Sequence, residues 1–447
     1  MRRQWSIAVG FLALIAIGAV VLSAPFARNA GSWGNFSGAI FTSFSAVCVT
    51  GLSVLDIAEE YTRAGQIVLM VLVQIGCLGL MTCGTFLLVA IGRRLSLARE
   101  FSLMNAYGVA QVQGLKGLIV WVVGCMLGVE LIGAALLWIR FRTLFPDDAV
   151  YMSAFYSMMS FCNAGFGILP GSLAPFADHP YVILVCAFLT IAGGFGFLAI
   201  YNLCTFKFLR RKSGGKGRLT LHTRLVMRFT GYLLAAAFVA FVLVEWNGAL
   251  EGMSFMKKMW VSFYQAVTPR TCGFCVVPTE SLHPLTRLIY GALMFIGGGP
   301  GSASAGIKIT TFAVLVYTLT AMCRGETETV IQRKTVPPDI VRESIVIFTA
   351  LTVLAFMIAG ALFVTEGEAV RSGKTTLEAL LFEAFSAITT TGLSMGSTTA
   401  NLSSAGRFVI IVAMFFGRLG ALSVVMLIGD RESKRQIKFP SEELVVG

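Results

Sequence analysis

Four segments of one length recur along the chain, and each begins with phenylalanine and ends with glycine. In every copy the final glycine is followed by leucine or phenylalanine. The copies are Phe41–Gly51, Phe155–Gly165, Phe263–Gly273 and Phe382–Gly392. Matched segments of this kind indicate that one structural unit occurs four times. This repetition restricts the possible folds more than any other property of the sequence.

The composition places these units in a membrane. Of the 447 residues, 56% are hydrophobic and 13% are charged, whereas a soluble protein carries about 25% charged residues. The formal net charge is +12. Arginine and lysine collect on the cytoplasmic side of membrane proteins, so this basic balance does not indicate a nucleic-acid partner. The cysteines lie mostly in apolar runs and are expected to be small core residues.

Apolar stretches flank each Phe-to-Gly segment, and about 20 apolar residues are needed to cross a bilayer. Eight stretches are candidates, two per repeat: 6–27, 64–92, 115–140, 179–206, 221–246, 284–323, 340–365 and 405–429. We predict an all-α integral membrane protein of four helix–pore loop–helix repeats around one central pore. The predicted divisions are 1–95, 96–212, 213–334 and 335–429 for the repeats, and 430–447 for a cytoplasmic tail. The first stretch also has features of a signal peptide, but repeat one needs a helix before Phe41, which favours an uncleaved helix.

The Phe-to-Gly segments are apolar but too short to span a membrane. They fit re-entrant pore loops, because irregular backbone at membrane depth must be buried in protein or line a water-filled cavity. The alternative is four outer loops that merely touch the bilayer. Basic residues gather in the connections between repeats and in the tail, which places both termini in the cytoplasm. The pore loops then enter from outside, where acids such as Asp147, Asp148, Glu366 and Glu368 would concentrate cations.

The residues that end each pore loop predict a selectivity filter. Ion filters are rings of backbone carbonyls or of charged side chains, and the four unlike sequences here share a main chain but no carboxylate. Carbonyl oxygens are therefore the predicted ligands, with glycine supplying the positive φ that aims them. Their weak field suits a large monovalent ion, which makes potassium the expected substrate. The predicted potassium site comprises Val49, Thr50, Gly51, Asn163, Ala164, Gly165, Thr271, Cys272, Gly273, Thr390, Thr391 and Gly392.

Glycines and a proline interrupt the second apolar stretch of repeat three. Five glycines at about 1 kcal/mol and one proline at about 3 kcal/mol disfavour a helix there by roughly 8 kcal/mol. The interruption then lies near mid-membrane and must line a cavity. We predict that it is a gate; a static kink packed by a neighbour is the alternative. The predicted gate residues are Gly297, Gly298, Gly299, Pro300, Gly301, Ser302, Ala303, Ser304, Ala305 and Gly306, with Lys308 and Arg418.

Arg418 occupies the middle of the last apolar stretch, where a charge costs at least ~2.5–3.5 kcal/mol and normally faces the bundle interior. One alternative is that it pairs with a buried acid such as Glu130 or with helix carbonyls. The other is that it faces the pore and holds the gate closed. Lys308 is a second candidate for that role. Arg270 and Glu383 lie in pore-loop segments, and we predict that they support the filter through hydrogen bonds; contact with solvent is the alternative.

The four loop ends resemble those of the Trk/Ktr/HKT superfamily of cation transporters, and most closely those of the membrane subunit of Ktr-type bacterial potassium uptake systems. The quoted matches are Val49-Thr50-Gly51-Leu52, Asn163-Ala164-Gly165-Phe166, Thr268-Pro269-Arg270-Thr271-Cys272-Gly273-Phe274 and Thr391-Gly392-Leu393. The resemblance implies potassium selectivity from a glycine in all four loops, an obstructing intramembrane loop and an arginine beneath the filter. Cys48, Cys272 and Pro300 depart from the commoner patterns.

We therefore expect gated, passive potassium uptake across a bacterial cytoplasmic (inner) membrane by a multi-pass protein, driven by the membrane potential. A sodium-permeable or poorly selective channel is the alternative. We expect no enzyme activity and no organic cofactor, since the sequence lacks a Walker lysine pattern and facing catalytic acids or His/Ser sets. The resemblance implies a homodimer and a cytoplasmic nucleotide-binding regulatory ring subunit. Lys207–Arg218 is either a flexible connector or a docking site for membrane lipid or a partner.

Overall fold

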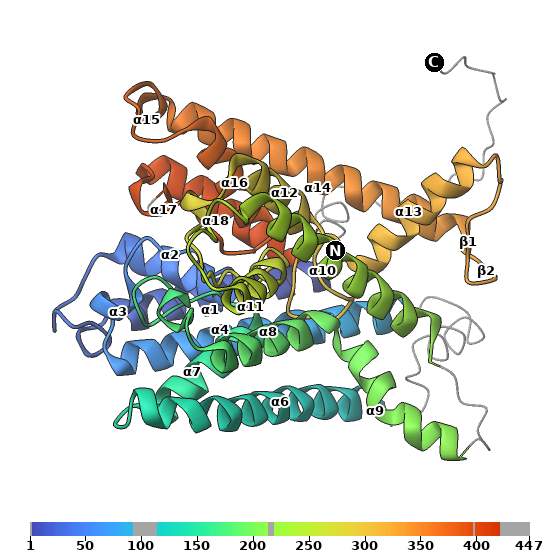
Figure 1. Ribbon diagram of the computed structural model, residues 1–447, viewed down its shortest axis with the longest axis horizontal. Helices are drawn as coiled ribbons and strands as arrows, with labels where there is room; N and C mark the ends of the chain where they lie inside the picture. The colour runs from blue at the N-terminus through green and yellow to red at the C-terminus, as the bar shows by residue number, and fades with distance from the viewer. Residues whose placement is uncertain (1, 93–113, 213–218, 397, 421–447) are drawn as a thin grey trace.

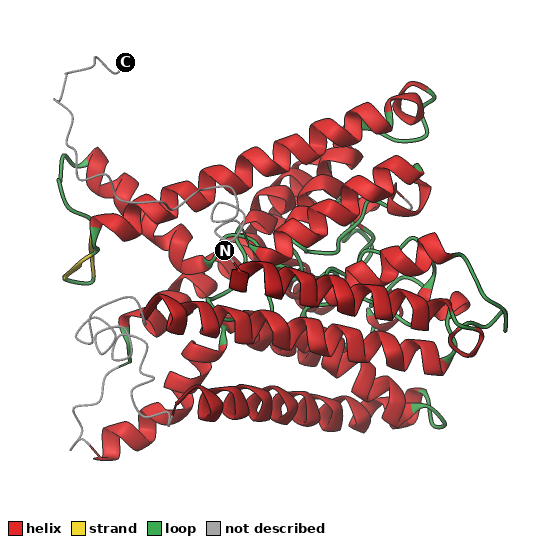
Figure 2. Ribbon diagram, turned by 180° about the vertical axis from the view of Figure 1, so that it is seen from behind, coloured by secondary structure: helices red, strands yellow, loops and turns green. Residues whose placement is uncertain are grey.

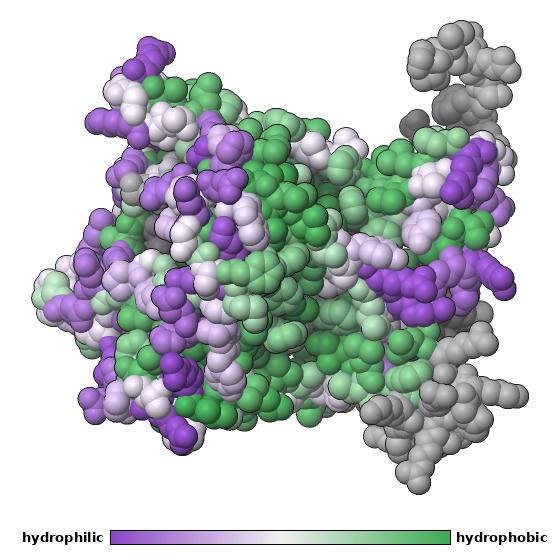
Figure 3. Space-filling view, viewed as in Figure 1, coloured by the Kyte–Doolittle hydropathy of each residue, from purple (hydrophilic) through white to green (hydrophobic). Residues whose placement is uncertain are grey.

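The chain is almost wholly helical in the computed structural model, which describes residues 2–92, 114–212, 219–396 and 398–420 (Figures 1 and 2). Most long helices run along the horizontal axis of Figure 1. Hydrophilic side chains gather toward the two ends of that axis, and a broad hydrophobic band lies between them (Figure 3). The predicted tail 430–447 and the basic connection near residues 93–99 lie outside the described residues.

The first unit contains a short helix held between two longer ones. The short helix α2 (Phe36–Val47) contacts both α1 (Arg2–Ser23) and α4 (Arg63–Gly92). Asn35 begins α2, and its side chain accepts a hydrogen bond from the Gly38 amide at 3.3 Å, which satisfies one of the free amides of the first turn. The one-turn elements that join these helices are η1 (Pro25–Ala27) and α3 (Ile57–Glu60).

The second unit repeats this arrangement. The short helix α7 (Ala149–Cys162) contacts α6 (Gly114–Leu144) and α8 (Pro180–Phe195). A short 3-10 turn, η2 (Ala174–Phe176), lies between α7 and α8. Proline at the first position of α8 removes an amide that would have no partner there in any case.

The third unit has the same three helices and an added one. The short helix α11 (Phe255–Val267) contacts α10 (Leu221–Glu245) and follows it directly in the chain. After η3 (Thr279–Ser281) comes α12 (Pro284–Phe295), which also contacts α10. The chain then leaves the helical conformation until α13 (Ile309–Cys323), so helix is absent where glycines and proline predict its interruption.

The fourth unit closes the bundle. The short helix α16 (Leu377–Ile388) contacts α14 (Pro338–Thr365) and α18 (Ser404–Leu419). Thr376 caps α16 by accepting from the Ala379 amide at 3.1 Å. The minor elements of this part are α15 (Gly367–Arg371), α17 (Thr398–Asn401) and the antiparallel pair β1 (Val330–Ile331) and β2 (Lys334–Thr335), which precedes α14.

The four units are joined in a closed cycle of helix contacts. In each case the last helix of one unit contacts the short helix of the next: α4 contacts α7, α8 contacts α11, α12 contacts α16, and α18 contacts α2. The series returns to its starting point, so the short helices are gathered toward the middle of the molecule. The longer helices form its outside, where large apolar side chains such as Val120, Leu131 and Leu243 are more than two-thirds exposed.

Helix length and apolarity alone identify three described helices as able to cross a membrane, Val120–Leu144, Leu221–Glu245 and Pro338–Thr365. A fourth candidate is the pair formed by α8 and α9 (Phe197–Lys212), which meet at a bend of 100°. The sequence predicts a membrane-spanning stretch over residues 179–206, and the structure bends this stretch at Gly196. Gly196 takes φ 88° and ψ 136°, a conformation that glycine adopts readily and that ends α8.

Candidate ion pathway

The four short helices each end at a turn with the same backbone conformation. Two residues before each final glycine, the chain adopts a positive φ, and the glycine itself is also at positive φ. The φ values are 52° and 88° at Val49 and Gly51, 57° and 65° at Asn163 and Gly165, 68° and 81° at Thr271 and Gly273, and 46° and 85° at Thr390 and Gly392. Residues other than glycine rarely take a positive φ. Its recurrence in all four segments therefore marks the turns as one kind of site. We call them the glycine turns.

The glycine turns meet one another around a common axis. Each final glycine faces the carbonyl oxygen of the residue that precedes the next glycine, and the series closes on itself. A Cβ atom placed on Gly273, for example, would lie 2.7 Å from the Thr391 oxygen and 3.0 Å from the Gly165 Cα, too close for any side chain. The facing pairs are Gly51 with Ala164, Gly165 with Cys272, Gly273 with Thr391, and Gly392 with Thr50.

Backbone amides of the glycine turns point back into the short helices. The Thr50 amide donates to the Ser45 carbonyl at 2.8 Å, and the Thr391 amide donates to the Ser386 carbonyl at 2.8 Å. The corresponding bonds in the other two units are Ala164 to Met159 at 3.0 Å and Cys272 to Thr268 at 3.1 Å. In a trans peptide the preceding carbonyl points the opposite way, so the carbonyls of Val49, Asn163, Thr271 and Thr390 point away from the short helices. The helices themselves direct a partial negative charge of about half a unit at the same region.

Side chains at the glycine turns are buried and serve the packing behind the ring. Cys272 is 3.3 Å from the Thr190 hydroxyl and 3.6 Å from the Tyr264 hydroxyl through its sulfur. The Asn163 amide lies 3.0 Å from the Ser304 hydroxyl, and with its oxygen accepting from Ser304 its nitrogen reaches the Ser160 carbonyl at 2.9 Å. Asn163 thus connects the second glycine turn to the 297–306 loop.

The 297–306 loop lies between α12 and α13 and is closed at its base. The Gly297 amide donates to Ile307 at 2.9 Å, and the Ile307 amide donates to Phe295 at 2.9 Å, which pairs Ile296 with Ile307. Ser302, Ala303 and Ser304 at the far end are almost fully buried. The loop is therefore a well-packed element inside the bundle.

The bend between α8 and α9 holds the loop from one side. The Gly299 amide donates to the Gly194 carbonyl at 2.8 Å, and the Ala303 amide donates to Gly193 at 3.1 Å. The Phe197 amide at the start of α9 donates to Gly301 at 3.2 Å. This contact was not among the predicted ones, although the Gly193-Gly194-Phe195-Gly196 run carries the signal for it. Close approach of two backbones requires glycines of this kind.

Arg418 and Lys308 both donate hydrogen bonds to carbonyls of the 297–306 loop. The Arg418 guanidinium donates to the Ala303 carbonyl at 2.7 Å and to the Gly76 carbonyl at 3.4 Å, and the residue is 2% exposed. Lys308 donates through Nζ to the Ser304 carbonyl at 2.6 Å. Glu130, the acid considered for Arg418, instead accepts from Gln74 at 2.9 Å. Among the described residues, the partners of Arg418 are therefore a loop carbonyl and a helix carbonyl, and not a buried acid.

Arg270 and Glu383 are both buried and contact different elements. The Arg270 guanidinium donates to the Gly297 carbonyl at 3.3 Å, so it contacts the base of the loop. Glu383 accepts from the Met395 amide at 3.2 Å and from the Thr399 hydroxyl at 2.7 Å, and it also accepts from the Ser394 hydroxyl. Glu383 therefore holds the segment that follows the fourth glycine turn. Glu383 is 0% exposed and Arg270 is 8% exposed.

This architecture defines a class of protein. It is a helical membrane protein whose short helices converge on a central ring of backbone turns. The chain matches the TrkH family of cation transport proteins over residues 9–441, and it belongs to that family. The fold agrees with this assignment. It superposes on the crystal structure of the potassium transporter TrkH from Vibrio parahaemolyticus with a TM-score of 0.75 and 15% sequence identity, covering 95% of this chain and 84% of that one.

Relatives of known function match nearly the whole chain. It is 35% identical over 445 residues to the Ktr system potassium uptake protein B of Bacillus subtilis, covering 99% of this chain and 96% of that protein. It is 32% identical over 445 residues to the potassium/sodium uptake protein NtpJ of Enterococcus hirae, with the same coverage. The predicted resemblance to Ktr-type membrane subunits is confirmed, and the family is one of potassium and sodium uptake transporters rather than enzymes.

Proposed function

We propose that the chain carries potassium into the cell through a gated pore whose filter is formed by backbone carbonyls of the glycine turns. The observation that carries this proposal is the closed series of glycine–carbonyl pairs around one axis. Carbonyls from four unlike segments can replace the water shell of a monovalent ion there. Transport is passive, and a membrane potential of 100 mV supplies about 2.3 kcal/mol for each charge that enters.

Potassium is the favoured substrate because the ring contains glycine in all four turns and no carboxylate. The Bacillus subtilis relative is named for potassium uptake, which supports the same choice. A second candidate is transport of both potassium and sodium. It is favoured by the Enterococcus hirae relative, which is named for both ions. A single glycine in each turn provides fewer stacked sites than a longer filter would, which is compatible with weaker discrimination.

The 297–306 loop is the proposed gate. Its burial inside the bundle, with Arg418 and Lys308 donating hydrogen bonds to its carbonyls, supports a closed state in which the loop and two positive charges obstruct the path. Non-helical backbone at membrane depth is tolerated where it is buried in protein or lines such a path. Movement of the loop would open it. The static-kink alternative predicts instead that loop variants change stability without changing flux.

The proposed setting is a cytoplasmic membrane crossed eight times, with four helix–pore loop–helix repeats and both termini inside. The recurring contact pattern of the four units supports this arrangement, since each short helix contacts the longer helix that precedes it in its unit, and α12 together with α13 would make one interrupted span. We extend the proposal to a homodimer regulated by a separate cytoplasmic nucleotide-binding ring subunit. The Bacillus subtilis relative is named as protein B of a Ktr system, which supports a partner.

Substitution of Gly51 by serine tests the filter assignment. An added Cβ there would overlap the Ala164 carbonyl and distort the ring, whereas at Gly128 in α6 it would meet nothing within 4 Å. Potassium and sodium uptake into proteoliposomes should show a lower potassium-to-sodium ratio for Gly51→Ser than for wild type, with Gly128→Ser unchanged. Equal ratios in all three proteins would refute the filter. Rescue of a bacterium that lacks potassium uptake tests the direction of transport.

A further inference from the structure

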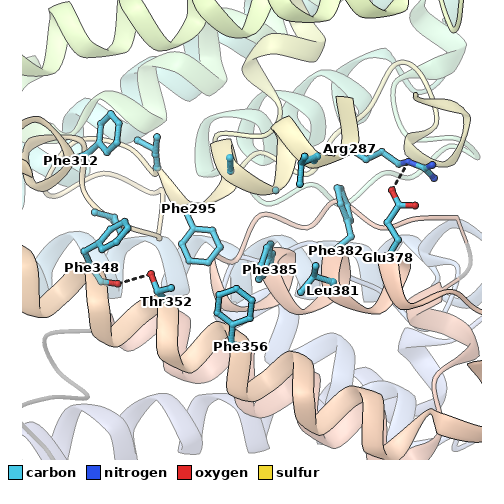
Figure 4. Close-up of a pocket in the computed structure, with 15 residues that line it drawn as sticks. Arg287, Phe295, Phe312, Phe348, Thr352, Phe356, Glu378, Leu381, Phe382 and Phe385 are labelled. Carbon is cyan, nitrogen blue, oxygen red and sulfur yellow. Dashed lines mark hydrogen bonds and ion pairs between the residues drawn. The ribbon is translucent and has the colours of Figure 1, made fainter. Parts of the chain in front are cut away.

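A cavity of about 510 Å³ lies between α12, α13, α14 and α16, next to the 297–306 loop (Figure 4). Its volume is within the range of roughly 300–1,000 Å³ that ligand pockets occupy. Side chains from all four helices point into it, and they are mostly apolar. Six of them are phenylalanines: Phe295, Phe312, Phe348, Phe356, Phe382 and Phe385. We call this cavity the phenylalanine pocket.

The phenylalanine pocket opens on the hydrophobic outside of the bundle. Three residues at its wall are strongly exposed: Leu288 is 70%, Phe356 is 58% and Phe348 is 43% exposed. In a membrane protein of this family, such a mouth faces hydrocarbon. The ligand with access to it is therefore an acyl chain of the surrounding bilayer, and burial of apolar surface drives its binding at about 25 cal/mol for each Å².

One ion pair lies at the end of the pocket near the starts of α12 and α16. The Arg287 Nε is 3.0 Å from the Glu378 Oε1, and the two side chains are 15% and 46% exposed. Figure 4 shows the pair at the edge of the phenylalanine cluster. A guanidinium beside a carboxylate complements the phosphate and the ammonium of a zwitterionic lipid headgroup. This charge arrangement favours a phospholipid over an uncharged apolar ligand.

The other end of the pocket touches the base of the loop. Phe295, Ile296 and Ile307 line the cavity, and Ile296 pairs with Ile307 through the backbone. On the side of the loop near Ser304 and Arg270, the free space is about 10 Å³, which holds at most one water molecule. The phenylalanine pocket is therefore the larger space into which the base of the loop can move. An acyl chain that fills the phenylalanine pocket therefore leaves no space for this movement of the loop.

We propose that one acyl chain of a zwitterionic membrane phospholipid occupies the phenylalanine pocket and holds the 297–306 loop in its blocking position. The proposal rests on the proposed function of the loop as a gate. A ligand that binds the closed state better than the open state shifts the population toward closed by its difference in affinity. Lipid occupancy is thus coupled to ion flux, and removal of the lipid favours the open state.

Lipid binding is measured first, independently of transport. Ala292 is an exposed residue of the pocket wall, so Ala292→Trp fills the space without burying a new group in the core. Ala236 is an exposed alanine of α10 outside the pocket, and Ala236→Trp is the matched control. The full-length proteins are delipidated, incubated with dioleoyl phosphatidylethanolamine and studied by native mass spectrometry. Wild type and Ala236→Trp should retain one lipid that Ala292→Trp lacks; equal retention in all three would overturn the binding site.

Two further variants test the pocket. One fills it from a second helix, and the other removes the charges proposed to bind the lipid headgroup. Thr352→Phe fills the pocket from α14 and should lose the same lipid, which keeps the test valid if Ala292→Trp does not fold. Arg287→Gln together with Glu378→Gln should weaken retention of phosphatidylethanolamine relative to diacylglycerol, which has the same chains but no charged headgroup. Unchanged preference in the double variant would refute the role of the ion pair.

Coupling to the gate is measured by potassium flux into proteoliposomes. The indole of Ala292→Trp fills the pocket permanently, whereas a lipid chain exchanges with the bilayer, so flux should fall relative to Ala236→Trp, within the range of about 5- to 150-fold typical of coupled sites. In a chain that lacks Gly298–Ser304, the same tryptophan should leave flux unchanged. Loss of the lipid without any change in flux would refute the coupling. If deletion of the loop itself does not raise flux, the gate is refuted, while the lipid result stands separately.

Discussion

Replacement of Arg418 by alanine should open the pore. Arg418 donates to the Ala303 carbonyl at 2.7 Å, and a hydrogen bond to a charged group is worth about 1.5–3 kcal/mol. Since each 1.4 kcal/mol is about tenfold in an equilibrium constant, loss of this bond should raise the ratio of open to closed channels by roughly 10- to 150-fold. The weaker bond to Gly76 at 3.4 Å adds a smaller amount.

The assay is potassium uptake into proteoliposomes that contain equal amounts of folded protein. Arg407→Ala is the matched control, because Arg407 lies on the same helix and donates to the Ala400 carbonyl at 2.8 Å, away from the loop. Arg418→Lys keeps the charge and should fall between wild type and alanine. A folded Arg418→Ala protein whose flux is equal to or lower than wild type would refute the reasoning, since the arginine would then not hold the loop closed.

Three further outcomes follow from the same geometry. Deletion of Gly298–Ser304 should raise potassium flux by removing the obstruction, and a flux at or below that of wild type would mean that the loop does not block the path. Gly196→Ala should raise flux or lower thermal stability, since a side chain at φ 88° costs about 1–3 kcal/mol and would meet the Pro300 carbonyl at 2.5 Å; a melting temperature and flux equal to wild type would count against the backbone contact. Glu383→Gln should weaken selectivity more than Glu368→Gln does, measured as the potassium-to-sodium flux ratio.

The four glycine turns could be predicted from the sequence because their conformation is a local property. Glycine at the last position and a turn at the end of a short apolar helix follow from residues that are adjacent in the chain. The interruption at residues 297–306 was predictable for the same reason, since glycine and proline act on their own backbone. The identity of the family followed from these same short segments, and the full-length relatives confirm it.

Contacts between segments that are distant in the sequence were harder to predict. The bend at Gly196 was missed because the surrounding stretch is continuously apolar, and hydropathy does not register a change of direction. Arg270 was expected to support the filter because it lies in a pore-loop segment, and no pattern in the sequence indicates that its side chain donates to the Gly297 carbonyl. The phenylalanine pocket is formed by four helices from two units, so no local pattern indicates it.

The cyclic arrangement of four non-identical units within one polypeptide allows symmetry to be broken at the axis. A channel assembled from four identical chains would have to place four copies of any obstructing loop at the same point, where they would collide. Here the third quadrant alone can supply the 297–306 loop, the second can supply the bend that receives it, and the fourth can supply Arg418. The presence of all four units in one polypeptide thus permits them to take different roles, which the identical subunits of a homotetramer cannot do.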